Sequence, residues 1–212
     1  SGLEVSGANA GGFGYANHIH GANSLVGGNG NTVDSQYSIC YGMGNTLFPT
    51  ALASGIIGVG CAITGDYSHI IGSYTAIYGD RSFSAGTMNY SNNSNCITIG
   101  NRCIAGAKTS AGMPETNADD CIAMGTNSIA YGQYGSMAIG FGCEASGSYS
   151  TAIGASTKAA YSYQFACGHY NSPDSSDIFE VGNGNGSIGR VNAFRITTSN
   201  TAYVGSTQVT SD

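Results

Sequence analysis

The sequence predicts an all-β fold, a parallel β-roll or solenoid built from coils of about 14 residues. Short apolar triplets that end in glycine recur along the chain, and the triplets ending at Gly58, Gly72, Gly86 and Gly100 lie 14 residues apart. Glycine supplies 34 of the 212 residues, more than twice the share of roughly 7% in a typical globular protein. Charged residues make up only 8% of the chain, against about 25% in a typical globular protein. Regularly spaced glycine costs a helix about 1 kcal/mol per site, so we expect short strands instead.

Each predicted coil holds two short strands, because a second, weaker apolar element lies about seven residues before each triplet. We expect glycine to supply the positive φ at each corner. The predicted inward side chains are Ile63, Ile77, Ile139 and Ile153, with Ala145 and Ala159 on narrower turns. A coil this thin depends on backbone hydrogen bonds to its neighbours. Eleven coils at about 4.8 Å spacing give a rod of about 50 Å, and its exposed apolar surface predicts lateral association.

The repeat divides the chain into two regions. Residues 1–170 are predicted to form a roll of about eleven coils, with a loop insertion at 107–120 where the spacing between glycines widens to 25 residues. The segment Asn171–Asp177 is polar and rich in turn formers, which is typical of a linker. Three later segments alternate apolar and polar residues and predict a small antiparallel meander, at Ile178–Gly184, Asn192–Ile196 and Thr201–Val204.

Two strands in the second half of the chain share the pattern Ser-x-Ala-Ile-Gly, at Ser136–Gly140 and Ser150–Gly154. With their surroundings, from Asn127 to Tyr170, they resemble the head repeats of trimeric autotransporter adhesins. The resemblance covers most of residues 10–170 and is degenerate toward the N-terminus. It implies a left-handed parallel roll, three copies of which pack around a common axis as a homotrimer.

The same repeats occur in bacteriophage tail fibres, and the C-terminal region favours that setting. The stretch Phe179–Phe194 resembles the segment that joins a roll to a self-cleaving chaperone in many phage tail proteins, and Thr210–Asp212 resembles the entrance to such a chaperone. We therefore expect residues 171–212 to lead into a C-terminal chaperone beyond this sequence. Adhesin heads lead into a coiled coil instead, and the sequence contains no heptad pattern.

The resemblance implies a phage tail fibre or receptor-binding protein that attaches the virion to its host. The expected location is the virion tail, assembled in the host cytoplasm. The head of a trimeric adhesin on the bacterial outer surface is the alternative. The expected partners are two further copies of the chain and a host cell-surface glycan or protein, because three weak sites on one rod gain effective concentration.

The cysteines predict folding in a reducing compartment. There are seven, an odd number, and none forms a C-x-x-C pair. Most stand beside Ile, Ala or Gly, where a thiol packs as a small apolar group. Free packed thiols of this kind are typical of cytoplasmic folding. They are expected at Cys61, Cys96, Cys103, Cys121, Cys143 and Cys167.

Several functional classes lack their usual signals. Six lysines and arginines scattered over 212 residues do not form a nucleic-acid-binding surface, and no apolar run is long enough to insert in a membrane. No Ser-His-Asp elbow and no phosphate-binding loop is present, so we expect neither an enzyme nor a cofactor. A glycan-degrading tailspike is the enzymatic alternative and needs two carboxylates in a groove. Asp66 and Asp80 are stacked candidates, which we interpret as turn caps.

The insertion supplies the candidate receptor contacts, because loops on rigid scaffolds often carry recognition. The candidates are Lys108, Met113, Glu115, Asp119 and Asp120. An insertion that the stack merely tolerates is the alternative interpretation. The 14 tyrosines add amphipathic side chains, several of them beside the turns.

His18-Ile19-His20 is the only H-x-H sequence. On a strand both imidazoles share one face, and three chains around an axis would offer six nitrogens to an octahedral metal. A pair of surface histidines without a metal is the interpretation we favour.

Overall fold

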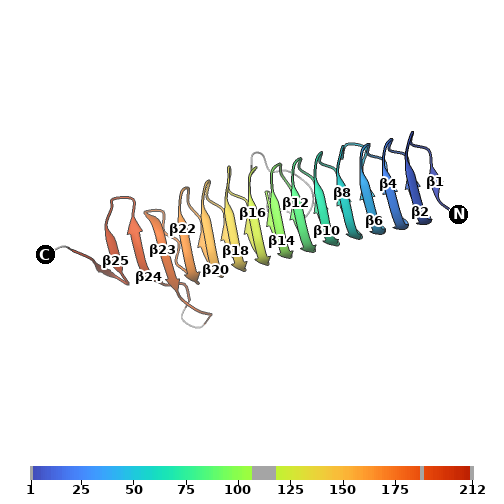
Figure 1. Ribbon diagram of the computed structural model, residues 1–212. Coiled ribbons are helices and arrows are strands. Elements are labelled where there is room, and N and C mark those ends of the chain that lie inside the picture. The colour runs from blue at the N-terminus through green and yellow to red at the C-terminus, as the bar shows by residue number, and fades with distance from the viewer. Residues whose placement is uncertain (1, 107–117, 187–188, 211–212) are drawn as a thin grey trace.

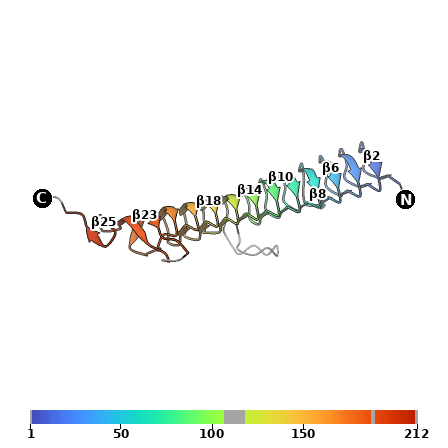
Figure 2. The ribbon, with the colours of Figure 1, turned by 90° about the horizontal axis from the view of Figure 1, so that it is seen from below.

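The structure, a computed structural model, describes residues 2–106, 118–186 and 189–210. The chain forms an elongated solenoid whose coils stack along one axis, with the two termini at opposite ends (Figure 1). Two parallel sheets run along the stack, one of long strands and one of short strands, and the view from below shows how thin the roll is (Figure 2). The predicted all-β parallel solenoid is confirmed. Within the described ranges, no helix is long and apolar enough to cross a membrane.

The long sheet is built from five-residue strands. They are β2 (Gly11–Tyr15), β4 (Leu25–Asn29), β6 (Ile39–Met43), β8 (Gly55–Val59), β10 (His69–Ser73), β12 (Phe83–Thr87), β14 (Ile97–Asn101), β16 (Ile122–Thr126), β18 (Met137–Phe141), β20 (Thr151–Ala155) and β22 (Phe165–His169). The short sheet is built from two-residue strands. They are β1 (Glu4–Val5), β3 (His18–Ile19), β5 (Thr32–Val33), β7 (Thr46–Leu47), β9 (Ala62–Ile63), β11 (Ala76–Ile77), β13 (Tyr90–Ser91), β15 (Ile104–Ala105), β17 (Ile129–Ala130), β19 (Glu144–Ala145) and β21 (Lys158–Ala159).

Neighbouring coils pair in register at 14-residue intervals, as Gly72 does with Gly86. Three intervals between paired residues exceed 14 residues. They are those from Gly42 to Gly58, from Gly100 to Gly125, and from Gly125 to Gly140. The largest addition ends before Ala118. Ala118–Asp120 already belong to the regular turn, since the Asp120 amide donates to Ser94 O at 3.1 Å as the Asn95 amide does to Asp80 O at 2.8 Å. The predicted insertion at 107–120 therefore includes three residues of the coil itself.

The core lies between the two sheets, and the second residue of each strand from β3 to β22 points into it. Four predicted inward residues are buried: Ile63, Ile77, Ala145 and Ala159. The prediction is wrong for Ile139 and Ile153, which are third residues of β18 and β20 and lie half-buried on the outer face. Ala138 and Ala152 occupy the core instead, because successive side chains of a strand point to opposite faces.

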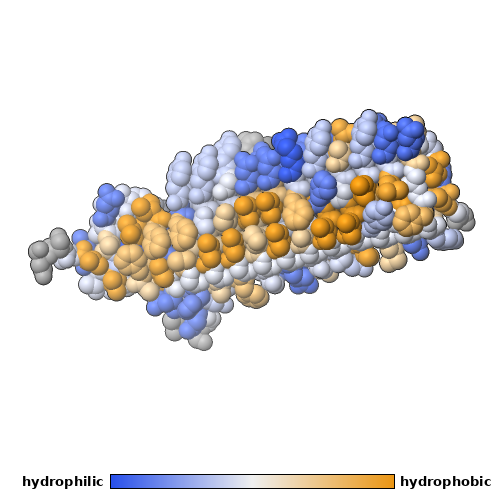
Figure 3. All heavy atoms as spheres, in the orientation of Figure 1, coloured by the Kyte–Doolittle hydropathy of each residue, from blue (hydrophilic) through white to orange (hydrophobic). Residues whose placement is uncertain are grey.

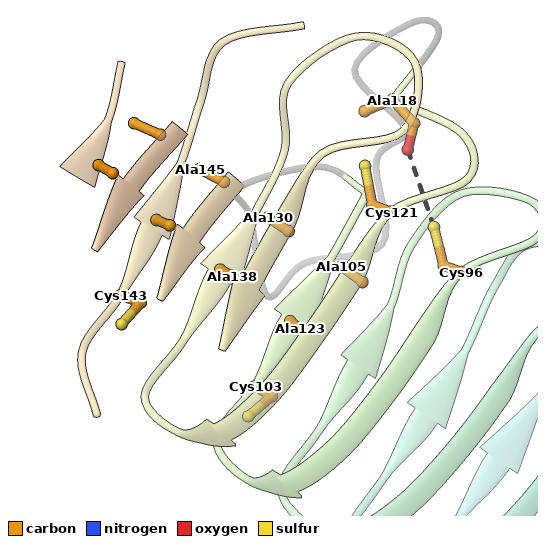
Figure 4. Close-up of a cluster of buried hydrophobic side chains, with 13 residues drawn as sticks. Cys96, Cys103, Ala105, Ala118, Cys121, Ala123, Ala130, Ala138, Cys143 and Ala145 are labelled. Atoms are coloured by element: carbon orange, nitrogen blue, oxygen red, sulfur yellow. Dashed lines mark hydrogen bonds between the residues drawn. The ribbon is translucent and has the colours of Figure 1, made fainter. Parts of the chain in front are cut away.

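The core changes composition along the roll. Its N-terminal part is dominated by large aliphatic side chains, among them Ile19, Val26, Leu47 and Ile56. In its C-terminal part, the apolar cluster of described residues consists of alanine and cysteine, as the close-up in Figure 4 shows. Because alanine offers little apolar area to bury, the C-terminal coils depend more heavily on the hydrogen-bond ladders of the backbone.

Glycine is required where neighbouring backbones meet. The fourth residue of every long strand from β2 to β22 is glycine, and a Cβ on Gly140 would lie 1.9 Å from Gly154 O at a φ of +130°. Many corners, by contrast, place other residues at positive φ, such as Tyr67 at 54° and Arg81 at 51°. The prediction that glycine supplies the positive φ at each corner is therefore wrong, and close backbone approach explains the regular glycine.

Buried polar side chains stack along both edges of the core. The Asn31 amide Nδ2 donates to Gly27 O at 3.1 Å and to Gly42 O at 2.9 Å, and its Oδ1 accepts from the Asn45 amide at 3.1 Å. On the other edge, Ser68 Oγ donates to Gly79 O at 3.1 Å and accepts from the Ser82 amide at 3.0 Å. These bonds satisfy buried backbone groups that the sheets leave unpaired.

Several cysteines take positions in these polar stacks, as Cys143 does, with its Sγ 3.1 Å from Gly154 O. All seven cysteines are free thiols. The predicted packing is confirmed for Cys61, Cys96, Cys103, Cys121 and Cys143, which are buried. Cys167 was predicted to be packed, but as the third residue of β22 it lies half-buried on the outer face of the sheet.

The C-terminal region is partly roll and partly meander. β23 (Asp177–Asn183) pairs in parallel with β22, so it continues the long sheet. β24 (Asn192–Thr197), β25 (Ala202–Val204) and β26 (Thr207–Gln208) then add antiparallel strands. The predicted meander is confirmed for these strands, whereas the parallel pairing of β23 was not predicted.

Candidate functional site

The outer face of the long sheet carries a row of apolar side chains along the roll, which we call the apolar face. Figure 3 shows it as an orange band running along the molecule. The first and third residues of the long strands form it, because the second residues point into the core. Its members are Leu25, Ile39, Tyr41, Ile57, Ile71, Phe83, Ile97, Ile99, Ile122, Met124, Met137, Ile139, Ile153 and Phe165.

One strongly exposed part of the apolar face lies over β6, β8 and β10. Ile39 is 50%, Ile57 57% and Ile71 52% exposed. Gly55 leaves a notch between them, a hollow of about 400 Å³ whose lining also includes His69. An apolar notch beside large exposed aliphatic side chains is suited to receive a side chain from another protein surface.

The apolar face continues into the C-terminal strands. Phe165 of β22 stacks on Phe179 of β23 with ring centroids 5.5 Å apart, and Phe179 meets the ring of Phe194 in β24 edge-on at 6.0 Å. The parallel pairing of β23 places Phe179 in register with Phe165. The row of outward apolar side chains therefore continues from the roll into the meander.

The structure separates the predicted receptor contacts. Lys108, Met113 and Glu115 lie outside the described residues. Asp119 is a half-buried member of the turn, where its Oδ1 accepts from the Ser94 amide at 3.0 Å. Asp120 is exposed at a corner, with φ of 62°. Asp120 thus offers a charged surface group, whereas the carboxylate of Asp119 is engaged in holding the coil.

Asp66 and Asp80 cap turns, as predicted. Asp66 Oδ1 accepts from the Leu52 amide at 2.8 Å, and Asp80 Oδ1 accepts from the Asp66 amide at 2.9 Å. With Asp119, these carboxylates form one stack of acceptors, each bound to the backbone of the preceding coil. Each of the three carboxylates therefore has a structural partner.

Tyrosines form a stack at one corner of the last coils. Tyr134, Tyr149 and Tyr163 occupy positive-φ positions on successive coils, and their ring centroids are 6.0 and 5.3 Å apart with nearly parallel planes. Tyr163, at the end of this stack, is 70% exposed. The stack presents the edges of three rings and the outer face of Tyr163 to solvent, which suits contact with a glycan or protein surface.

The two histidines of the H-x-H sequence lie on the outer face of the short sheet, with acidic groups on both neighbouring coils. His18 Nδ1 lies 2.9 Å from Glu4 Oε2, and His20 Nδ1 lies 2.7 Å from Asp34 Oδ1. The hydrogen bond with Asp34 raises the pKa of His20. Sequence reasoning found the histidines but missed Glu4 and Asp34, although each lies one 14-residue period from a histidine.

A buried acidic cluster closes the C-terminal end of the roll. Glu180 is fully buried, and its Oε1 accepts from Gln164 Nε2 and from the Asp174 amide, both at 2.9 Å. Burial raises the pKa of the Glu180 carboxyl to about 7. Asp177 is also buried, and burial raises its pKa although Arg195 lies 3.2 Å away.

A hollow of about 510 Å³ beside this cluster is lined by Asp174, Asp177 and Arg195 but not by Glu180. Sequence reasoning missed the cluster. The signal was available in the repeat, because Glu180 lies one period after the inward residue Ala166 and is in register with it. A charged residue at an inward position indicates a specialised end of the roll.

No family model matches the chain, and no curated protein matches its sequence. The function proposed below therefore rests on the chain's own residues and on the resemblance of its repeats.

Proposed function

We propose that this chain is a segment of a homotrimeric attachment fibre of the bacteriophage tail-fibre type, which contacts a host cell-surface glycan or protein. The carrying observation is the apolar face, a row of exposed and half-buried aliphatic and aromatic side chains along the long sheet. A soluble protein rarely leaves a contiguous apolar surface larger than a few hundred Å² uncovered. Two further copies of the same chain cover it if the three long sheets face a common axis.

The resemblance of the repeats supports both the proposed trimer and the proposed left-handed coiling of each chain. The head repeats that Ser136–Gly140 and Ser150–Gly154 resemble coil to the left and associate in threes. In this arrangement the apolar face is buried, and the short sheet and the corners face outward. Such a rod carries three copies of every outward site, and multivalent contact strengthens weak binding to a repetitive cell surface.

Attachment without cleavage agrees with the state of the carboxylates. Asp66 and Asp80 bind backbone amides, and Asp177 pairs with Arg195. Glu180 has the raised pKa of a general acid but is fully buried, so a glycan has no access to it. A glycan-degrading tailspike remains the competing class, and the experiment below distinguishes the two.

The test combines binding with a matched activity assay. The purified chain is applied to a glycan array and to a panel of bacterial cells, and the same glycans are assayed for released reducing ends. We expect binding without released sugar. A monomeric variant with Ile57→Ser and Ile71→Ser serves as the control and should bind at least 100-fold more weakly, because it loses multivalency. Release of sugar, or binding to neither glycans nor cells, contradicts the proposal.

A further inference from the structure

Four side chains on three successive coils meet on the outer face of the short sheet near the N-terminus. Glu4 belongs to β1 and pairs in register with His18 of β3. His20 follows on the same face as His18, because residues two apart on a strand share a face. Asp34 lies one coil further along, in line with His20. The parallel ladder therefore fixes the positions of all four groups.

The geometry of three of these groups is that of a metal site. One ligand atom each from Glu4, His18 and His20 can be chosen so that all lie within 4.8 Å of one another. His18 Nδ1 is 2.9 Å from Glu4 Oε2, and His20 Nε2 is 3.8 Å from Glu4 Oε1. Metal bonds of about 2.0–2.2 Å put neighbouring ligand atoms about 3–3.5 Å apart. Small side-chain rotations are enough to reach that geometry.

Asp34 supplies an independent indication. Its Oδ1 lies 2.7 Å from His20 Nδ1, so His20 donates its Nδ1 proton to this carboxylate, and Nε2, which faces Glu4, is the nitrogen that can bind a metal once it loses its proton. A carboxylate behind a histidine is the usual support for a metal-ligating imidazole, because it fixes the tautomer and makes the ligand more basic.

Charge favours a divalent cation at the same place. Glu4 and Asp34 bring two negative charges, and the first 80 residues of the chain contain no lysine or arginine to balance them. Two imidazoles and a carboxylate suit zinc, nickel, copper and iron better than calcium or magnesium. Three protein ligands leave the remaining coordination positions to water.

We propose that Glu4, His18 and His20 form a binding site for one divalent transition-metal ion within each chain, with Asp34 as the support of His20. This site differs from the six-nitrogen axial site considered from the sequence. The histidines lie on the short sheet, and the two sheets enclose the core between them. If the long sheets meet at the trimer axis, the histidines point away from that axis. The expected stoichiometry is one ion per chain and not one per trimer.

The bound ion would stabilise β1 at the N-terminal edge of the solenoid. β1 is an edge strand with β3 as its only partner among the described strands. It is held by the hydrogen bonds of the Glu4 amide to Asn17 O and of the Ser6 amide to Ile19 O, both at 2.9 Å. A metal that joins Glu4 to His18 and His20 adds a cross-link between these strands, and local opening of β1 becomes rarer.

The test uses the full chain after dialysis against a chelator, with ZnCl2 as the probe in isothermal titration calorimetry. We expect one Zn²⁺ per chain with micromolar or tighter affinity. Glu4→Gln and His18→Ala should each weaken binding at least tenfold, and Asp34→Asn should weaken it by about 10- to 100-fold without changing the stoichiometry. His69→Ala is the matched control, since His69 lies on the other sheet and lines the notch, and it should bind as the wild type does.

Two further measurements do not depend on the variants. Co²⁺ bound to the wild-type chain should show d–d absorption bands of a site with nitrogen and oxygen ligands. Hydrogen exchange of the Glu4 and Ser6 amides should slow at least tenfold when Zn²⁺ is added. Absence of Zn²⁺ binding, one ion per three chains, or equal loss of binding in His69→Ala would each overturn the proposal. These outcomes are independent of whether the chain binds any cell surface.

Discussion

Replacing two isoleucines of the apolar face by serine should dissociate the assembly without unfolding the chain. Ile57 and Ile71 pair in register on adjacent coils and are 57% and 52% exposed. Full burial of an isoleucine side chain is worth about 1.5–3 kcal/mol, so covering the exposed half in a trimer contributes about 0.8–1.6 kcal/mol per side chain. The variant Ile57→Ser/Ile71→Ser then loses about 5–10 kcal/mol per trimer, which lowers the association constant by about 10⁴- to 10⁷-fold.

Analytical ultracentrifugation across a concentration series measures this effect. The wild type should sediment as three times the chain mass of 21.4 kDa, and the double variant as the single chain over the same range. Phe48→Ser is the control, because Phe48 is an exposed apolar residue that follows β7 in the short sheet. Circular dichroism should be alike in all three proteins. A monomeric wild type, or a double variant as trimeric as the control, refutes the reasoning.

Three further predictions concern the stack, the thiols and the insertion. In thermal unfolding, Gly140→Ala should destabilise the fold by about 2–5 kcal/mol, because the added Cβ would lie 1.9 Å from Gly154 O. The control Gly142→Ala should cost only about 1–2 kcal/mol, because the nearest atom to its Cβ is 3.6 Å away. Alkylation and mass spectrometry should find seven free thiols after denaturation. The fastest reaction of the native protein should be at Cys167, since it is half-buried whereas the other six cysteines are buried. Deleting residues 107–117 should abolish binding to host cells and leave the melting temperature almost unchanged; retained binding would place the receptor site elsewhere.

The fold was predictable because its defining constraint is periodic. A glycine at the fourth position of each long strand is needed for close backbone approach, and a constraint that recurs in every coil is visible in the sequence. The inward side chains were less predictable. In Ser150–Gly154 both Ala152 and Ile153 are apolar, so composition alone does not show which of them points inward, and the larger residue is the outward one.

The candidate sites were predictable only where one coil contains them. His18 and His20 lie on one strand and its continuation, and the sequence shows them together. Glu4 and Asp34 join them through pairing between coils, which becomes visible once each coil is aligned with the next. The apolar face could not be predicted either, because the sequence does not show which residues of a strand point outward. An outward isoleucine and an inward one cannot be told apart until that alternation is fixed by the structure.

The buried carboxyl of Glu180 predicts that stability falls as the pH rises from about 4.5 to about 7. Its pKa is 4.5 in an ordinary environment and about 7 in the fold, where burial disfavours the charged form. Between these values the unfolded chain releases the proton while the folded chain retains it, so the free energy of unfolding decreases by up to about 3 kcal/mol. Asp177 acts in the same direction, because burial also raises its pKa, and Arg195 opposes it.

Glu180→Gln removes the titration while keeping the size of the side chain. Thermal unfolding of both proteins between pH 4.5 and pH 7.5 should show a falling melting temperature for the wild type and a much flatter profile for the variant. The variant should be less stable than the wild type at low pH. Gln164 and Asn171 donate to the two different oxygens of the Glu180 carboxyl, and both oxygens still accept hydrogen bonds when the carboxyl is protonated. In the glutamine variant an NH2 group replaces one of these oxygens and meets an N–H donor without accepting from it. Equal pH profiles for the two proteins would show that Glu180 keeps an ordinary pKa, and that the three N–H groups around it stabilise its charge more than burial penalises it.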